Sequence, residues 1–178
     1  MPANPNPAPD HRITNGLVAD ISPHIGVLVI NWAFIEQAMS AVFEATEKVA
    51  LEAGVKVRRP FAFTGKRDQF KALFAGVDKL DEFRPRAAQM LDGVDNLTPL
   101  RNCVVHGSLH SYDAASGFLT FAKVNPDKGE THHVLIEHRV KLASLEPAAN
   151  ACTRLATDLQ RLAAELMDLL DRDEPANA

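Results

Sequence analysis

The sequence predicts a mainly helical protein, an antiparallel four-helix-type bundle with a small antiparallel β-meander inserted at about 108–138. Two long segments carry apolar residues at alternating spacings of three and four, the period of helices that pack in bundles. Between these segments, three short strand-like runs are separated by turn residues. The composition, with 46% hydrophobic and 24% charged residues, is that of an ordinary globular protein.

The chain is expected to form one domain over residues 11–171, flanked by two tails. Residues 1–10 contain four prolines and no large apolar residue after Met1, which predicts a disordered arm. Residues 172–178 form a polar tail. We find no basic and apolar leader of the signal-peptide type and expect no membrane span, since no apolar run approaches roughly 20 residues.

The two long helices define the predicted bundle. The first is expected at about 23–53, with Ser22 as its N-cap, Pro23 as its first residue and Gly54 as its end. The last begins after Ser144, the expected N-cap. Their apolar stripes contain Ile25, Leu28, Trp32, Ile35, Met39, Val42, Thr46 and Val49, and Leu145, Ala148, Cys152, Leu155, Leu159, Leu162, Leu166 and Leu169.

Shorter elements precede and follow the first long helix. Residues 11–22 predict a separate short helix. Thr64 is the expected cap of another, which carries Phe70, Leu73, Phe74 and Val77 on one face. A third helix is predicted to begin near Asp81. Pro99 lacks the N–H needed for its helical hydrogen bond, so it either kinks this helix or begins a new one. The expected strands are 109–112, 118–124 and 132–138.

The cysteines and histidines indicate neither a disulfide nor a metal site. Cys103 and Cys152 lie in predicted helices without the spacing of metal ligands, so we expect buried, reduced thiols and a cytoplasmic protein. His132 and His133 are adjacent on a predicted strand and therefore point to opposite faces. We expect no metal and no cofactor. The net charge of −4 also excludes a globally basic nucleic-acid-binding protein, so such binding requires a local basic patch.

The stretch 100–107 carries the strongest functional signal. Asn102 and His106 are four residues apart and share a helix face, and Arg101 is long enough to bring its guanidinium to that face. Gly107 is expected to end the helix and to leave the imidazole near an open end. An imidazole can exchange protons near neutral pH, and a guanidinium can hold a phosphate by two hydrogen bonds.

The segment Arg101-Asn102-Cys103-Val104-Val105-His106 resembles the motif of HEPN domains, an arginine, a polar residue, three intervening positions and a histidine. Trp32-Ala33-Phe34-Ile35-Glu36 on an early long helix and the short segment Phe63-Thr64-Gly65-Lys66 are also similar to segments of HEPN-like proteins. The resemblance covers roughly residues 23–107 and extends in part to the last helix. The inserted sheet departs from the minimal bundle.

The resemblance implies a homodimer that cleaves single-stranded RNA without a metal ion, as a toxin or defence component. Arg101, Asn102 and His106 would be its catalytic residues, and facing motifs in a dimer would supply separate acid and base. A protein partner or antitoxin is also implied. Lys66 and Arg67 form a weaker candidate substrate-binding pair.

A structural role is the main alternative for these residues. Arg101 can form a buried ion pair with Glu36, the supporting residue on the first long helix. His106 can bond to a carbonyl at the helix end, where the helix dipole favours a cation. The protein would then be a non-catalytic HEPN-like binding or scaffolding module, with the sheet as its partner surface. A coincidental motif in an unrelated helical bundle is the third alternative.

Overall fold

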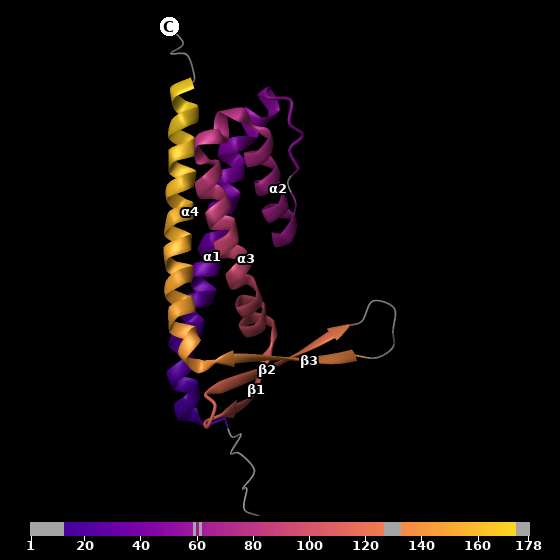
Figure 1. Cartoon of the computed structure of the whole chain (residues 1–178), viewed down its shortest axis with the longest axis vertical. Coiled ribbons are helices and arrows are strands. Elements are labelled where there is room, and N and C mark those ends of the chain that lie inside the picture. Colours follow the sequence, from indigo (N-terminus) through magenta and orange to yellow (C-terminus); the bar gives the residue numbers. More distant parts are fainter. Residues whose placement is uncertain (1–12, 59, 61, 127–132, 174–178) are drawn as a thin grey trace, which may run out of the picture. The chain divides into compact units, whose positions relative to one another are not determined.

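The protein is mainly helical and contains one small sheet (Figure 1). The computed structural model describes residues 13–58, 60, 62–126 and 133–173. The elements in order are α1 (Asn15–Glu52), α2 (Phe63–Gly76), the 3-10 helix η1 (Asp78–Phe83), α3 (Arg84–His106), β1 (Ser108–Asp113), β2 (Phe118–Pro126), β3 (His133–Lys141), the 3-10 helix η2 (Leu142–Ser144) and α4 (Leu145–Asp173).

The predicted tails fall largely beyond the described chain. The arm over residues 1–10 and residues 174–178 lie outside the described residues. The polar tail was expected from residue 172, but α4 continues to Asp173. The helix therefore extends slightly beyond the end of its apolar stripe.

The chain forms two compact units. We call Ile30–Leu97 with Ala151–Ala178 the helical unit, and Met1–Val29 with Thr98–Asn150 the sheet unit. Three helices, α1, α3 and α4, contribute residues to both units. The single domain expected over 11–171 stays a prediction.

The core of the helical unit receives side chains from α1, α2, α3 and α4. Both predicted apolar stripes contribute to it, and Phe70 of α2 stacks on Phe74 with 4.7 Å between ring centroids. The largest fully buried side chains of this core are Ile35, Met39, Val42, Phe70, Leu73, Leu80, Leu159, Leu162 and Leu166. Burial of this apolar surface is the main force that holds the four helices together.

The first helix begins earlier than predicted. α1 starts at Asn15, and the Thr14 hydroxyl accepts a hydrogen bond from the Leu17 N–H at 3.1 Å, as an N-cap does. The separate helix over 11–22 was therefore a wrong prediction, and so was the capping role of Ser22. The Ser22 hydroxyl donates to the Val18 carbonyl at 2.6 Å inside the helix, and Pro23 lies within it.

The predicted end of α1 is confirmed. Gly54 has a φ of +73°, the left-handed conformation that glycine adopts without strain. The Val55 N–H donates to the Ala50 carbonyl at 2.8 Å, which closes the helix as a C-terminal cap.

The starts of two later helices, α2 and α3, differ from the sequence prediction. Thr64 lies inside α2, whose N-cap residue is Ala62 and has no side-chain capping bond. The third helix was expected near Asp81, but this residue belongs to η1, and α3 begins at Arg84. α4 begins at Leu145, directly after Ser144, as predicted. The Ser144 hydroxyl donates to the Lys141 carbonyl at 2.7 Å, a local hydrogen bond that serine forms readily next to a helix.

Pro99 lies within α3, which excludes the alternative that it begins a new helix. The segment with Arg101 and His106 is thus the C-terminal end of a 23-residue helix.

The three strands form the predicted antiparallel meander, in the order β1-β2-β3. Phe118 pairs with Asp113 on one side and with Lys141 on the other, and the register of β1 shifts between Leu109 and Ser111. The inner face of the sheet contributes Leu119 and Phe121 to the core of the sheet unit, which also contains Leu17, Ile21, Cys103 and Leu145. His132 lies outside the described residues.

Both cysteines are free and buried, as predicted. Burial raises the pKa of the Cys152 thiol to about 11, so the reactive thiolate is scarce at neutral pH.

α1 also meets a length and composition criterion for a membrane span. Its segment Asn15–Glu47 contains an 18-residue window with mean hydropathy 1.5. No membrane span was expected from the sequence. A third of that window is buried, and core helices of water-soluble proteins meet the same criterion. The finding by itself does not indicate a membrane.

Truncation of Phe70 tests the core of the helical unit. Phe70→Ala is expected to lower the free energy of unfolding by about 3–5 kcal/mol, because Phe70 is 0% exposed and its removal leaves a cavity. Urea unfolding followed by circular dichroism measures the change. Leu51→Ala is the control, because Leu51 is 60% exposed and its truncation should change stability by less than about 0.5 kcal/mol. Equal losses in the two variants would contradict this assignment of the core.

Candidate functional site

The C-terminal turns of α3 carry the three residues of the motif. Arg101 and Asn102 are half-buried, whereas His106, the last residue of the helix, is exposed. Cys103, between them in sequence, is buried in the core of the sheet unit. This anchor fixes the helix face and leaves the polar side chains on its accessible sides.

One guanidinium nitrogen of Arg101 contacts both other residues of the motif. Arg101 Nη1 donates to Asn102 Oδ1 at 3.0 Å and lies 3.1 Å from His106 Nε2. A guanidinium has no acceptor, so this contact requires the lone pair of the imidazole on Nε2 and its proton on Nδ1. The expected reach of Arg101 to the face of Asn102 and His106 is confirmed.

Gly107 closes the helix where there is no space for a side chain. Its N–H donates to the Cys103 carbonyl at 2.9 Å. A Cβ at this position would lie 2.5 Å from that oxygen and 3.2 Å from Phe121 Cβ of the sheet. Glycine therefore allows the end of α3 to approach β2 closely, and the chain turns into β1 directly after the motif.

Glu36, the proposed supporting residue, contacts a residue of its own helix. Its carboxylate accepts a hydrogen bond from Trp32 Nε1 at 3.0 Å, one helical turn away on α1. Glu36 belongs to the helical unit and Arg101 to the sheet unit. Their ion pair stays a prediction.

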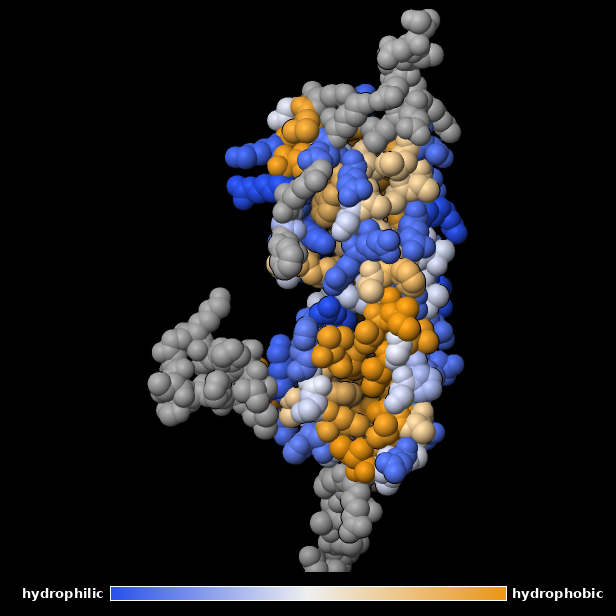
Figure 2. Space-filling view, turned by 180° about the vertical axis from the view of Figure 1, so that it is seen from behind, coloured by the Kyte–Doolittle hydropathy of each residue, from blue (hydrophilic) through white to orange (hydrophobic). Residues whose placement is uncertain are grey.

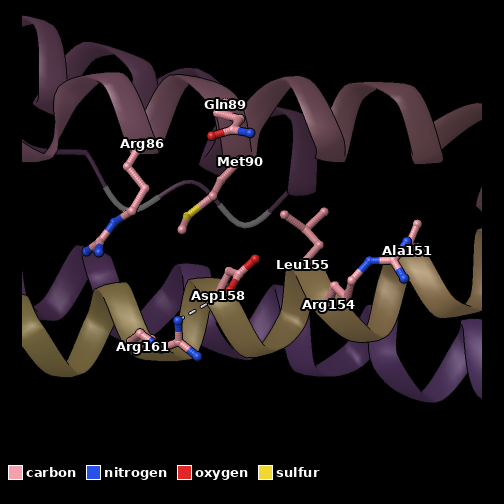
Figure 3. A pocket seen from close by; sticks show the side chains of 8 residues that line it. All are labelled: Arg86, Gln89, Met90, Ala151, Arg154, Leu155, Asp158 and Arg161. Atoms are coloured by element: carbon pink, nitrogen blue, oxygen red, sulfur yellow. Dashed lines mark ion pairs between the residues drawn. The ribbon is translucent and has the colours of Figure 1, made fainter.

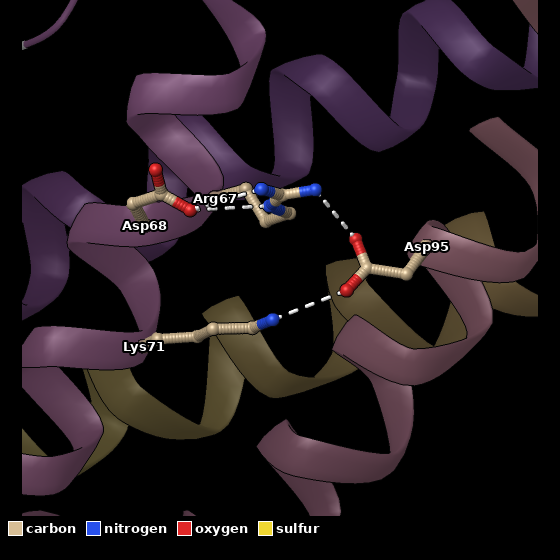
Figure 4. Close-up of polar contacts among 4 residues, drawn as sticks. All are labelled: Arg67, Asp68, Lys71 and Asp95. Carbon is tan, nitrogen blue, oxygen red and sulfur yellow. Dashed lines mark hydrogen bonds and ion pairs between the residues drawn. The ribbon is translucent and has the colours of Figure 1, made fainter.

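Lys66 and Arg67, the weaker candidate pair, both have partners within the helical unit. Lys66 Nζ donates to Ser40 Oγ at 3.3 Å. Arg67 contacts Asp68 at 3.1 Å and Asp95 at 2.9 Å (Figure 4). These carboxylates raise the pKa of Arg67 and compensate its charge. Substrate binding by this pair stays a prediction, and it would compete with these contacts.

Asp95 of α3 connects two cations of α2. One carboxylate oxygen accepts from Arg67, and the other accepts from Lys71 at 3.1 Å (Figure 4). Burial alone would raise the pKa of Asp95, but the hydrogen bonds from Lys71 and Arg67 outweigh it, so the pKa is lowered. Sequence reasoning missed this residue, because no local pattern shows that Asp95 lies opposite two cations 24 and 28 positions away.

A second polar cluster was also missed. Arg86 of α3 forms two hydrogen bonds to Glu165 of α4, and Arg154 and Arg161 line the same groove between these helices. Arg154, Arg161 and Glu165 recur at helical spacing on α4. Such spacing of charged residues by itself indicates only a solvent-exposed helix face.

No group of three or more His, Cys, Asp or Glu side chains placed to hold a metal ion occurs in the described part of the chain. Comparison with known proteins gave no matching family model, no similar curated protein and no similar solved structure. The geometry of the motif and of the polar clusters therefore carries the functional argument.

Asp95 gives a pH prediction. Its lowered pKa contributes stability above the unfolded value of about 3.9, and this contribution is lost as the pH falls through the folded value. Asp95→Asn should lower the melting temperature by roughly 1–4 °C near neutral pH, as expected for a partly exposed ion pair. The wild-type and variant melting temperatures should converge as the pH falls through the lowered folded pKa of Asp95.

Thermal melts at a series of pH values measure this convergence. Asp168→Asn, which changes an exposed carboxylate of α4 outside the cluster, is the control. A constant difference between wild type and Asp95→Asn at every pH would show that the carboxylate charge is not responsible.

Proposed function

We propose that the protein is a HEPN-like antiparallel four-helix-type bundle with an inserted β-meander, and that it is a metal-independent endoribonuclease acting on unpaired RNA. The observation that carries the proposal is the joint contact of Arg101 Nη1 with Asn102 and His106, on an accessible helix end. The three residue types are those that phosphodiester cleavage next to a 2′-hydroxyl needs, and they lie within hydrogen-bonding reach of one another.

The chemistry assigns one role to each side chain. The 2′-oxygen of the RNA attacks the adjacent phosphorus, and the bond to the 5′-oxygen breaks, which leaves a 2′,3′-cyclic phosphate. His106 accepts the 2′-hydroxyl proton through Nε2, the nitrogen that has the lone pair. Arg101 stabilises the additional negative charge on the phosphate, and Asn102 orients the guanidinium.

Binding of the substrate phosphate to Arg101 would free His106 to act as the general base. Both N–H groups of Arg101 Nη1 point to Asn102 and His106 in the unbound protein. A phosphate oxygen is a stronger acceptor than a neutral amide or imidazole, so it would take these donors and leave Nε2 open to the 2′-hydroxyl.

A second copy of the chain is the proposed partner. One chain has a single His106, and a facing copy would add the acid that protonates the 5′-oxygen. The part of α1 in the helical unit has an exposed, uncharged face formed by Ile30, Ala33, Phe34 and Gln37. Figure 2 shows apolar residues gathered over α1. An uncharged apolar face suits a twofold interface, where each residue meets the same surface.

Cleavage of RNA in the absence of metal tests the activity. Purified protein is incubated with an unstructured RNA oligonucleotide in EDTA, and the products are resolved by gel and mass spectrometry. Wild type should give products with a 2′,3′-cyclic phosphate. His106→Ala should reduce the rate by at least about a hundredfold. Arg101→Lys should also lose activity, because a lysine cannot form the paired contacts of a guanidinium.

His138→Ala provides the matched control, since His138 is an exposed histidine of β3 outside the motif. DNA of the same sequence should stay intact, because it lacks the 2′-hydroxyl. Equal cleavage by wild type and His106→Ala would identify a contaminant, and no cleavage by wild type would end the ribonuclease proposal.

A charge on the exposed face of α1 tests the dimer. Light scattering after size-exclusion chromatography should give wild type about twice the 19.4 kDa chain mass at about 100 µM. Ile30→Glu should give a monomer, because two carboxylates would be buried at the interface. Met167→Glu, at a 49% exposed apolar residue of α4, should leave the mass unchanged. A monomeric wild type, or a dimeric Ile30→Glu, would contradict the dimer.

The alternative function is a non-catalytic HEPN-like binding or scaffolding module. The specific observation in its favour is that Arg101 already donates to two side chains of its own chain, as a structural network would. In that case RNA would stay intact, and His106→Ala would lower the melting temperature by several degrees.

A further inference from the structure

The second polar cluster of the helical unit forms a groove between α3 and α4, with a cavity of about 330 Å³. Arg86, Arg154 and Arg161 contribute guanidinium groups, and Asp158 contributes a carboxylate (Figure 3). Met90 and Leu155 lie between the two helices and form apolar lining. The groove is thus cationic and partly apolar, and its size is in the range of small-molecule sites.

The three arginines of the groove differ in their partners. Arg86 is held by Glu165, which accepts hydrogen bonds at both of its carboxylate oxygens. These bonds lower the pKa of Glu165, so its charge compensates that of Arg86. Arg161 forms a long ion pair with Asp158, with 3.9 Å between Nη1 and Oδ1, which is too long for a hydrogen bond. Within the described residues, Arg154 has no hydrogen bond or ion pair.

Arg154, which has no partner among the described residues, and Arg161, which forms only a long ion pair, are therefore the two guanidinium groups most available to a ligand. Arg154 and Arg161 are seven residues apart on α4, which places them on one face about 10 Å apart along the helix. Asp158 is the carboxylate among the lining residues, and Glu165, which is paired with Arg86, also interacts electrostatically with Arg161. The local charge is positive in a chain whose net charge is −4, so the general composition does not account for it.

We propose that this groove binds a small phosphate ester with an apolar part. Arginine pairs bidentately with phosphate, and a dianionic phosphate can accept donors from two guanidiniums at once. Arg154 and Arg161 would hold the phosphate, while the apolar part covers Met90 and Leu155. This site uses no residue of the Arg101 and His106 motif, so it stands independently of the proposed ribonuclease activity.

Titration of the full chain with adenosine monophosphate tests the site. Amide chemical shifts are followed by NMR at constant ionic strength, which removes the general effect of salt. Shifts should be largest at the groove, including Met90 and Leu155. Adenosine and inorganic phosphate should each bind more weakly than the monophosphate, because each lacks half of the contacts.

Three substitutions should change the affinity for adenosine monophosphate in different ways. Arg154→Gln should weaken binding by about tenfold through the loss of a charged contact. Asp158→Asn should strengthen binding, because a repelling carboxylate is removed. Arg58→Gln, at an exposed arginine outside the groove, should change nothing. Shifts outside the groove, or an equal effect of Arg58→Gln and Arg154→Gln, would overturn the proposal.

A short single-stranded RNA is the second ligand to be titrated, because its backbone contains phosphate groups of the same kind. Tighter binding of the monophosphate supports the small-molecule assignment. Tighter binding of the RNA at the groove would overturn it in favour of a backbone contact. The His106→Ala variant should bind the monophosphate as wild type does, so this test gives its answer whether or not the protein cleaves RNA.

Discussion

The burial of two apolar stripes, those of α1 and α4, is the constraint on which the helical unit depends. Ile35 and Met39 of α1 and Leu159 and Leu162 of α4 are fully or almost fully buried in the same core. α3 shares this core through its first half and reaches the core of the sheet unit through Cys103. A helix anchored by apolar contacts in both halves has its polar positions fixed by geometry, because the 3.6-residue period leaves no choice of face.

The functional argument follows from which groups Arg101 contacts. Arg101 Nη1 contacts the Asn102 amide oxygen and the His106 imidazole. A hydrogen bond from a guanidinium to a phosphate is stronger than one to an amide or an imidazole, so a phosphate can replace these two contacts. The same contacts also hold the two side chains in place in the unbound protein. A structural and a catalytic role therefore differ in what an added anion does, not in the resting geometry.

The sequence predicted the elements well where one strong periodic signal dominates. The stripes of α1 and α4, the three strands and the end of α1 at Gly54 depend on apolar spacing or on the conformational freedom of glycine. Two predicted helix starts were wrong, because Ser22 lies inside α1, where its hydroxyl donates to a carbonyl, and Thr64 lies within α2. The start of α4 directly after Ser144 was predicted correctly.

The candidate site was predictable only in part, for a related reason. Arg101 and His106 are five residues apart on one helix, so their contact follows from local geometry. Asp95 and the groove arginines depend on which helices pack side by side, and single positions carry no signal of that.

Net charge does not show where on this chain the proposed anion site lies. The guanidinium groups of several arginines form ion pairs with carboxylates. Examples are Arg67, Arg84 and Arg86. An incoming phosphate would have to displace that carboxylate, and the exchange gains little. Arg154 has no such partner in the part of the chain that the structure describes, and it lies in a groove with apolar lining, so a phosphate there adds an interaction without breaking one. In an acidic protein, the position of an uncompensated guanidinium therefore decides the anion site, and it can be identified only after the ion pairs are assigned.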